Sequence, residues 1–154
     1  MSEWKKIVKE LTLDEKIGMI HGDGLFRTKG VERLSIPPLI MSDGPMGVRN
    51  DFKNDEWKAI GQNDDYVTYL PSISALASTW NRELAYTSGD VLGEEARGRG
   101  KDVILGPGVN IKRTPLCGRN FEYFSEDPYL TIEMAVPFIK GVQKHDVAAC
   151  LKHF

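Results

Sequence analysis

Three short polar clusters in the chain contain residue types that could bind or transform a polar ligand. The first is centred on Asp43, which follows a short apolar run and precedes Gly44 and Pro45, where the backbone is expected to turn. A carboxylate held in such a turn can accept two hydroxyl protons from a sugar or can bind a metal ion. The alternative interpretation is an aspartate that only caps the turn, because Asx-turns are common.

The second cluster is Gly118-Arg119-Asn120-Phe121-Glu122. A planar guanidinium beside glycine and an aromatic ring could present paired donors to a carboxylate, a phosphate or vicinal hydroxyls, although a solvated loop arginine is the alternative. The third cluster is Lys152 and His153, two adjacent donors after an apolar run. Neighbouring residues of a strand face opposite ways, so both reach one site only if the chain turns there. A structural role for either remains the other interpretation.

The sequence contains no motif for a phosphate-binding loop or a zinc site, and only weak candidates for a catalytic carboxylate pair. The glycine-rich stretch 93–101 lacks the spacing of a phosphate-binding loop, and neither His-Glu-x-x-His nor Cys-x-x-Cys occurs. We therefore expect neither a metal nor a cofactor. The acidic residues Glu94, Glu95, Glu122 and 126–127 are weak candidates for a catalytic carboxylate pair. Glu94 and Glu95 in particular are adjacent on a predicted helix and cannot face each other.

Composition restricts the broad class of protein. The 154 residues are 41% hydrophobic and 27% charged, with 20 basic and 22 acidic residues and a formal net charge of −2, which is typical of a globular domain. Because the basic residues are interspersed with acids, and no apolar run is long enough to span a bilayer, we expect no nucleic-acid and no membrane partner. Cys117 and Cys150 are interpreted as thiols with packing roles. The N-terminus lacks a signal-peptide pattern, which favours a cytoplasmic protein.

Alternating helices and strands are predicted to position the three clusters. Two short helices are expected between Trp4 and His21, meeting at a Thr12–Glu15 capping box. Buried strands are expected at 39–41, 103–105 and 147–151, helices at 78–99 and 128–144, and an exposed loop at 50–66. The buried face of the helix over 78–99 is predicted to consist of Trp80, Leu84, Val91, Leu92 and Ala96.

This order of elements predicts an α/β fold with a parallel sheet covered by helices, because its strands are short and nearly continuous in apolar residues. The polar clusters then lie at or just beyond the carboxyl ends of strands. That edge is where open α/β sheets and α/β barrels hold their ligands.

Taken together, the motifs resemble glycoside hydrolase family 3, the β-glucosidase-type family. The matching segments are Ser42-Asp43-Gly44-Pro45 with Gly47-Val48-Arg49, Ala77-Ser78-Thr79-Trp80-Asn81, Leu105-Gly106-Pro107-Gly108-Val109-Asn110, the run 118–128 and Lys152-His153-Phe154. The resemblance extends over nearly the whole chain from Leu11 on. It implies a partial (β/α)8 TIM-type barrel, with residues 1–154 supplying N-terminal helices and about the first three βα units of an incomplete barrel domain.

The resemblance also implies roles for individual residues. Asp43 would accept the non-reducing-end hydroxyls of a donor sugar in the innermost subsite, and the surrounding donors and walls would be Arg49, Leu105, Arg119, Lys152 and His153. The reaction would be retaining hydrolysis of terminal β-D-glucosyl residues, with an aspartate nucleophile and a glutamate acid/base. Both carboxylates are expected beyond Phe154, so this chain alone would be inactive.

The expected partners are therefore a β-glucoside or related oligosaccharide and the remainder of the same enzyme. Alternatives within the family are a β-xylosidase and a β-N-acetylglucosaminidase. A non-catalytic sugar-binding fragment is the alternative from a different class.

Overall fold

The computed structural model describes residues 2–49, 56, 58 and 66–153. The predicted loop over 50–66 falls almost entirely outside these residues, as does Phe154. The described chain forms two compact units. One is built around residues 2–40, and the other consists of residues 41–49 and 66–153. In neither unit does a described helix have both the length and the apolar character needed to cross a membrane.

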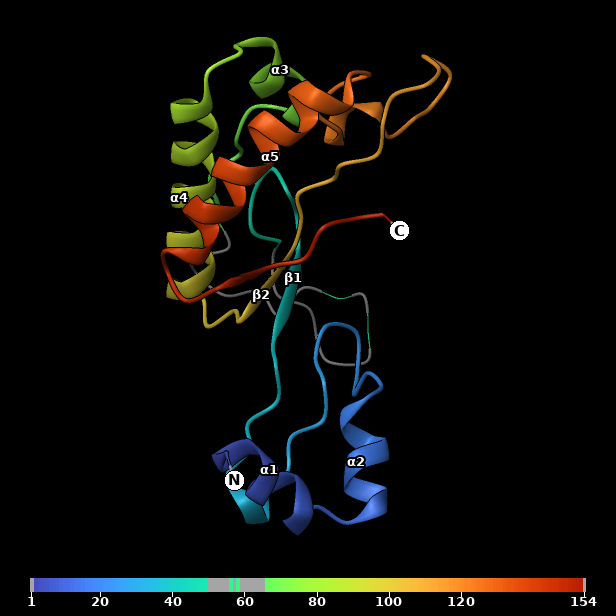
Figure 1. Cartoon of the computed structure of the whole chain (residues 1–154), viewed down its shortest axis with the longest axis vertical. Coiled ribbons are helices and arrows are strands. Elements are labelled where there is room, and N and C mark those ends of the chain that lie inside the picture. The colour runs from blue at the N-terminus through green and yellow to red at the C-terminus, as the bar shows by residue number, and fades with distance from the viewer. Residues whose placement is uncertain (1, 50–55, 57, 59–65, 154) are drawn as a thin grey trace. The chain divides into compact units, whose positions relative to one another are not determined.

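The first unit contains two short helices, α1 (Glu3–Glu10) and α2 (Leu13–Met19), which meet at Thr12 as predicted (Figure 1). The predicted capping box is confirmed, because the Thr12 hydroxyl accepts the Glu15 N–H at 3.2 Å and the Glu15 carboxylate accepts the Thr12 N–H at 2.8 Å. Arg33, in the short helix η1 (Glu32–Leu34), donates to the same carboxylate at 2.7 Å. These bonds fix the start of α2.

The second unit is built on a parallel sheet in the order β1 (Met41–Asp43), β2 (Val103–Leu105) and β3 (Ala148–Ala149). The predicted parallel sheet is confirmed. Strand β1 extends two residues beyond its predicted end, so that Asp43 is its last residue and pairs in register with Leu105.

The prediction of a third buried strand over 147–151 is wrong in part. Val147 is buried, but strand β3 has only two residues, and Ala148, Cys150 and Leu151 are exposed. The packing roles predicted for the cysteines are also wrong, since Cys117 and Cys150 are both exposed free thiols.

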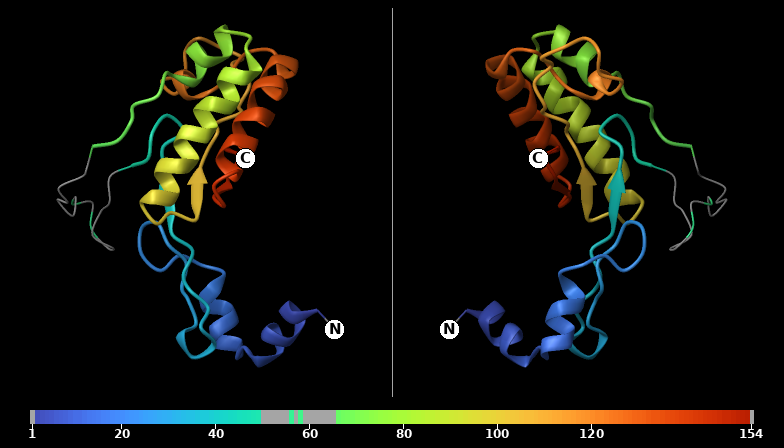
Figure 2. Two further views of the ribbon diagram at one scale, coloured as in Figure 1. Left: turned by 90° about the vertical axis from the view of Figure 1, so that its left-hand side faces the viewer. Right: turned by 90° about the vertical axis from the view of Figure 1, so that its right-hand side faces the viewer.

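Helices α4 (Arg82–Gly98) and α5 (Pro128–Gln143) lie side by side (Figures 1 and 2) and pack against β2 and β3 respectively. A shorter helix, α3 (Ile73–Ser78), precedes α4. Glycines allow the close approach of α4 and α5: a Cβ atom at Gly89 would lie 2.0 Å from the Phe138 carbonyl oxygen. The core of the unit comprises Val48, Ile73, Leu76, Ala77, Ala85, Leu92, Ala96, Ile104, Phe124, Met134, Ala135, Phe138, Val142 and Val147.

The helix predicted over 78–99 begins later than expected. The Asn81 side chain accepts the backbone N–H groups of Glu83 at 2.9 Å and Leu84 at 3.2 Å, which makes Asn81 the N-cap and Arg82 the first helical residue. Trp80 therefore lies outside the helix, with a φ of 55°.

The predicted buried face of that helix is only partly correct. Leu92 and Ala96 are buried and Val91 is half-buried, whereas Trp80 and Leu84 are exposed. Small residues form the rest of the buried face of α4, because α5 packs too closely against this helix for larger side chains. By contrast, the helix predicted after Asp127 is confirmed as α5, with Asp127 as its N-cap.

Candidate functional site

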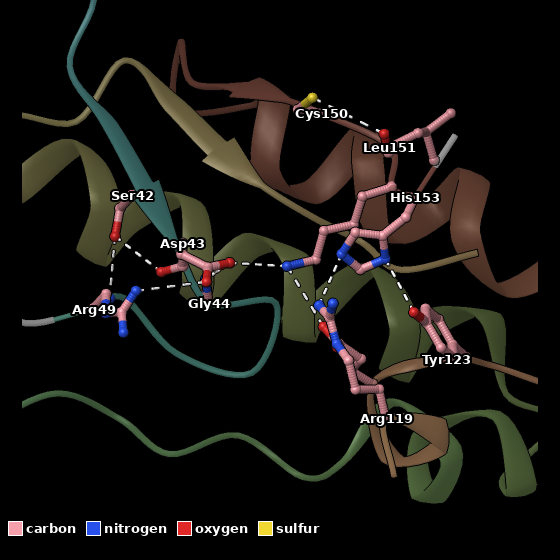
Figure 3. A network of polar contacts seen from close by, with 11 residues as sticks. Ser42, Asp43, Gly44, Arg49, Arg119, Tyr123, Cys150, Leu151 and His153 are labelled. Atoms are coloured by element: carbon pink, nitrogen blue, oxygen red, sulfur yellow. Dashed lines mark hydrogen bonds and ion pairs between the residues drawn. The ribbon is translucent and has the colours of Figure 1, made fainter. Parts of the chain in front are cut away.

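Asp43 lies at the carboxyl end of β1, at the centre of a network of polar contacts (Figure 3). Its Oδ1 accepts the Gly44 N–H at 3.0 Å, which is the turn-capping contact that the sequence left open. The same oxygen accepts a hydrogen bond from Lys152 Nζ at 2.8 Å, and Oδ2 lies 3.7 Å from Arg49 Nη1. Asp43 therefore caps the turn and also binds two cations.

The loop after β1 returns Arg49 to Asp43. Gly44 has a φ of 120°, and a Cβ atom there would lie 1.9 Å from the Gly47 carbonyl oxygen, so only glycine fits. The buried Ser42 hydroxyl accepts the Arg49 N–H at 3.1 Å, and the Asp43 carbonyl lies 3.2 Å from the same nitrogen. The backbone thus fixes the position from which the Arg49 side chain extends.

Lys152 enters the network from the segment after β3. Its backbone N–H donates to the Pro107 carbonyl at 3.2 Å, and its carbonyl accepts the Val109 N–H at 2.8 Å, so pairing with the segment after β2 continues here. The side chain is only 12% exposed. In addition to its bond to Asp43, Nζ lies 3.4 Å from Glu122 Oε2. One ammonium is therefore shared by two carboxylates.

Arg119 and Glu122 lie at the two ends of the short helix η2 (Asn120–Glu122), in the connection before α5. The Glu122 side chain is 6% exposed and accepts a hydrogen bond from Arg119 Nε. The sequence suggested Glu122 only as a weak acid/base candidate, and the structure instead makes it the partner of two cations. The spacing of three residues between Arg119 and Glu122 is the one sequence signal for this pair.

His153 completes the network. Its Nε2 lies 2.8 Å from Arg119 Nη2, its Nδ1 lies 3.0 Å from the Tyr123 hydroxyl, and its backbone N–H donates to Asn110 Oδ1 at 2.6 Å. Because a guanidinium only donates, Nε2 must accept, and the proton of the neutral ring is then on Nδ1 and points to Tyr123. The peptide bond between Lys152 and His153 is cis. Tyr123 and Asn110 were not predicted as site residues.

The structure thus unites most of the predicted site residues. The polar contacts connect Asp43, Arg49, Arg119, Lys152 and His153. Leu105 takes no part in these polar contacts but lies opposite Asp43 in the β1–β2 pairing, half-buried at the end of its strand.

The surroundings of the network shift the pKa values of its members. Partial burial would raise the pKa of Asp43, but the hydrogen bond and charge of Lys152, the Gly44 N–H and the charge of Arg49 together hold this pKa below its ordinary value. Loss of solvation, followed by the charges of Arg119 and Lys152, lowers the pKa of His153. At neutral pH the site therefore presents an ionised acceptor, cationic donors and a neutral imidazole.

This arrangement suits binding better than proton transfer. Asp43 and Glu122 are both bonded to the same ammonium, and Asp43 is held in its ionised form. Within the described ranges, no group of three or more His, Cys, Asp or Glu side chains is placed to hold a metal ion. What the geometry offers is a charged acceptor ringed by donors, which matches the hydroxyls of a sugar.

Residues 8–154 match the family profile of the glycosyl hydrolase family 3 N-terminal domain. The chain belongs to glycosyl hydrolase family 3. It is 53% identical over 150 residues to thermostable beta-glucosidase B of Acetivibrio thermocellus, a match that covers 97% of this chain and 20% of that protein. It is 42% identical over 147 residues to an exo-alpha-(1->6)-L-arabinopyranosidase of Bifidobacterium longum, covering 96% of this chain and 19% of the relative.

The structural comparison gives the same family. Beta-glucosidase 3B from Thermotoga neapolitana, solved in complex with glucose, superposes with a TM-score of 0.89 at 42% identity, covering 99% of this chain and 23% of that one. The family and the partial α/β barrel expected from the motifs are thereby confirmed. The chain spans about a fifth of the length of the relatives that it matches.

Proposed function

We propose that the full protein hydrolyses glycosides and releases terminal non-reducing β-D-glucosyl residues, and that this chain holds the donor sugar. The observation that carries the proposal is the position of Asp43. Its side chain is 39% exposed at the end of β1, and Lys152 and Arg49 contact its two oxygens. A pyranose presents adjacent hydroxyls that both donate and accept, and an ionised acceptor among cationic donors matches that pattern. The beta-glucosidase names of relatives support the same substrate.

The remaining donor capacity of the site supports sugar binding. Lys152 has three ammonium protons, of which two are directed at Asp43 and Glu122 among the described residues, so one is left for a ligand. Arg119 uses Nε for Glu122 and one Nη2 proton for His153, which leaves donors on its exposed side. Bonds of this kind assist a reaction when they tighten as the sugar ring flattens toward the transition state.

We further propose a retaining mechanism whose aspartate nucleophile and glutamate acid/base lie in parts of the protein outside this chain. Retention requires two carboxyl groups about 5–5.5 Å apart, on opposite sides of the glycosidic bond. Asp43 and Glu122 do not suit these roles, because a single ammonium links them and Glu122 is covered. The chain's contribution is then to orient the sugar so that its anomeric carbon faces the catalytic pair.

The test uses the full-length protein and an aryl β-D-glucoside. Proton NMR of the first-formed sugar should show β-glucose, which later mutarotates. Initial release of α-glucose would overturn the retaining mechanism. Glucose binding without any hydrolysis would instead support the non-catalytic alternative.

A substrate panel distinguishes the alternative sugars. One relative, at 42% identity, is named an arabinopyranosidase, which makes aryl α-L-arabinopyranosides a necessary comparison. Aryl β-xylosides and β-N-acetylglucosaminides complete the panel. The glucoside should have the highest kcat/KM. A higher kcat/KM for another glycoside would show that its sugar, and not glucose, is the preferred substrate.

A further inference from the structure

Two carboxylates bind the Lys152 ammonium, and they differ in their access to solvent. Asp43 Oδ1 lies 2.8 Å from Nζ, and the Asp43 side chain is 39% exposed. Glu122 Oε2 lies 3.4 Å from Nζ, and its side chain is 6% exposed. The other Glu122 oxygen accepts from Arg119 Nε. A ligand arriving at the site can therefore meet Asp43, Lys152 and Arg119, whereas Glu122 is covered.

The backbone holds Glu122 firmly beneath the cations. Gly108 forms parallel bridges both to Tyr123 and to Lys152, so the segments that carry Glu122 and Lys152 meet at one residue. A Cβ atom at Gly108 would lie 2.5 Å from the Glu122 carbonyl oxygen, which shows how closely the two segments pack. The Glu122 N–H also donates to the Arg119 carbonyl at 3.1 Å. Close packing thus fixes the backbone from which the Glu122 carboxylate reaches the longer side chains of Lys152 and Arg119.

We infer that Glu122 is a positioning residue, which holds Lys152 and Arg119 in the places from which they donate to the sugar and does not contact the sugar itself. The inference rests on the proposed function, because it names the residue that arranges the proposed donors. Its physical basis is that a lysine removed from water needs a counter-ion at every stage of binding. When sugar hydroxyls donate hydrogen bonds to Asp43, that carboxylate contacts both the ligand and Lys152. Glu122 then contacts only the two cations.

Loss of the Glu122 charge would leave an excess of positive charge around Asp43. Only one carboxylate would then remain for three cations, Arg49, Lys152 and Arg119. The negative charge of Glu122 would no longer offset the repulsion between these cations. Arg119, whose pKa is raised chiefly by its hydrogen bond to Glu122, would lose its main anchor. We expect the guanidinium to move toward solvent and Lys152 to be drawn more tightly to Asp43, which weakens Asp43 as an acceptor for the sugar.

The experiment compares Glu122→Gln, Glu122→Asp and a control, Glu133→Gln, in the full-length protein. Glu133 also forms an ion pair with an arginine, Arg82, at 2.7 Å, but on the exposed faces of α5 and α4. Competitive inhibition by D-glucose measures binding, and ligand-free crystal structures of the variants locate the cations. Glu122→Gln should raise the inhibition constant on the order of tenfold or more. Glu122→Asp, which keeps the charge, should raise it less, and Glu133→Gln should leave it unchanged.

The crystal structure of Glu122→Gln should show Arg119 or Lys152 displaced while the backbone of residues 119–123 keeps its path. An unchanged inhibition constant, or cations that keep their positions, would overturn the inference, even if the melting temperature fell. If Glu122→Gln does not fold, an unchanged inhibition constant in Glu122→Asp would overturn it equally. A wild-type protein that neither hydrolyses the glycoside panel nor binds glucose would overturn the proposed function instead, and the cation positions in the crystals would still decide the role of Glu122.

Discussion

Lys152 Nζ donates to Asp43 Oδ1 at 2.8 Å across 109 residues of sequence. The contact joins the carboxyl end of β1 to the segment that follows β3, and β2 lies between these two strands in the sheet. It can form only when both outer strands are paired with β2, so the site exists only once the sheet has assembled.

Replacing Asp43 should abolish most activity without unfolding the protein. In the full-length protein, Asp43→Ala removes the charged acceptor, and we expect kcat/KM to fall by about 100-fold or more. The fold should survive, because Lys152 keeps Glu122 as a counter-ion at 3.4 Å. Steady-state kinetics and thermal unfolding measure the two effects. Asp23→Ala, which breaks the surface ion pair with Arg27 at 3.1 Å, serves as the control and should retain activity. An Asp43→Ala protein with near-normal kcat/KM would refute the role of Asp43.

Two glycine substitutions should have opposite outcomes. Gly44→Ala places a Cβ 1.9 Å from the Gly47 carbonyl oxygen at a φ of 120°, so the loop that returns Arg49 must distort. We expect a lower melting temperature and weaker glucose binding. Gly98→Ala, at the last residue of α4, meets no atom within 4 Å and should be neutral or stabilising by up to about 1 kcal/mol. Differential scanning calorimetry would measure both, and equal melting temperatures for the two variants would contradict the prediction.

The turn after β1 could be predicted because the sequence signal for a turn is local, although β1 itself extends two residues further than predicted. Asp43 is followed by Gly44 and Pro45, a dipeptide that marks a turn. The same local logic explains the correct N-caps at Thr12 and Asp127. Residues fixed by their immediate neighbours were therefore placed well, and the family motifs added the long-range association of the site residues.

Tertiary context decided what was missed. Glutamate is usually exposed to solvent. The spacing of Arg119 and Glu122 suggests one ion pair, but nothing local indicates that Lys152 will also contact this carboxylate or that its side chain will be buried. Cys150 lies in an apolar run that resembles a buried strand, but β3 ends at Ala149, and periodicity does not tell where strand pairing stops. Trp80 fits a helical pattern, but Asn81 is the N-cap, so α4 begins after Trp80. The close glycine contacts between α4 and α5 favour small residues on the buried face of α4.

The start of α2 should lose protection from exchange as the pH falls. The hydrogen bond from Arg33, aided by the Thr12 backbone N–H, lowers the pKa of Glu15 from 4.5 to about 2. Because the folded-state pKa is depressed, the stabilisation is complete above the unfolded value and is lost as the pH falls toward about 2. Hydrogen exchange over residues 13–19 should be faster in Glu15→Gln than in wild type near neutral pH, and the difference should vanish at the acid end of this range. Arg33→Ala should shift the loss to higher pH, and a constant difference across the range would contradict the prediction.

Glucose binding should weaken on the acid side of neutrality because of His153. Loss of solvation and the charges of Arg119 and Lys152 lower the pKa of His153 below its ordinary value of 6.5, so the folded site favours the neutral ring. The contribution of the neutral ring to stability and binding is present above pH 6.5. It is lost as the pH falls through the folded-state pKa, because protonated Nε2 can no longer accept from Arg119.

The glucose inhibition constant of the full-length protein should therefore rise in this range for wild type and stay flat for His153→Gln. His145→Gln is the matched control, since His145 contacts Asp90 on α4 at 2.5 Å, and it should keep the wild-type profile. A His153→Gln protein whose inhibition constant still rises in the same range would assign the titration to another group.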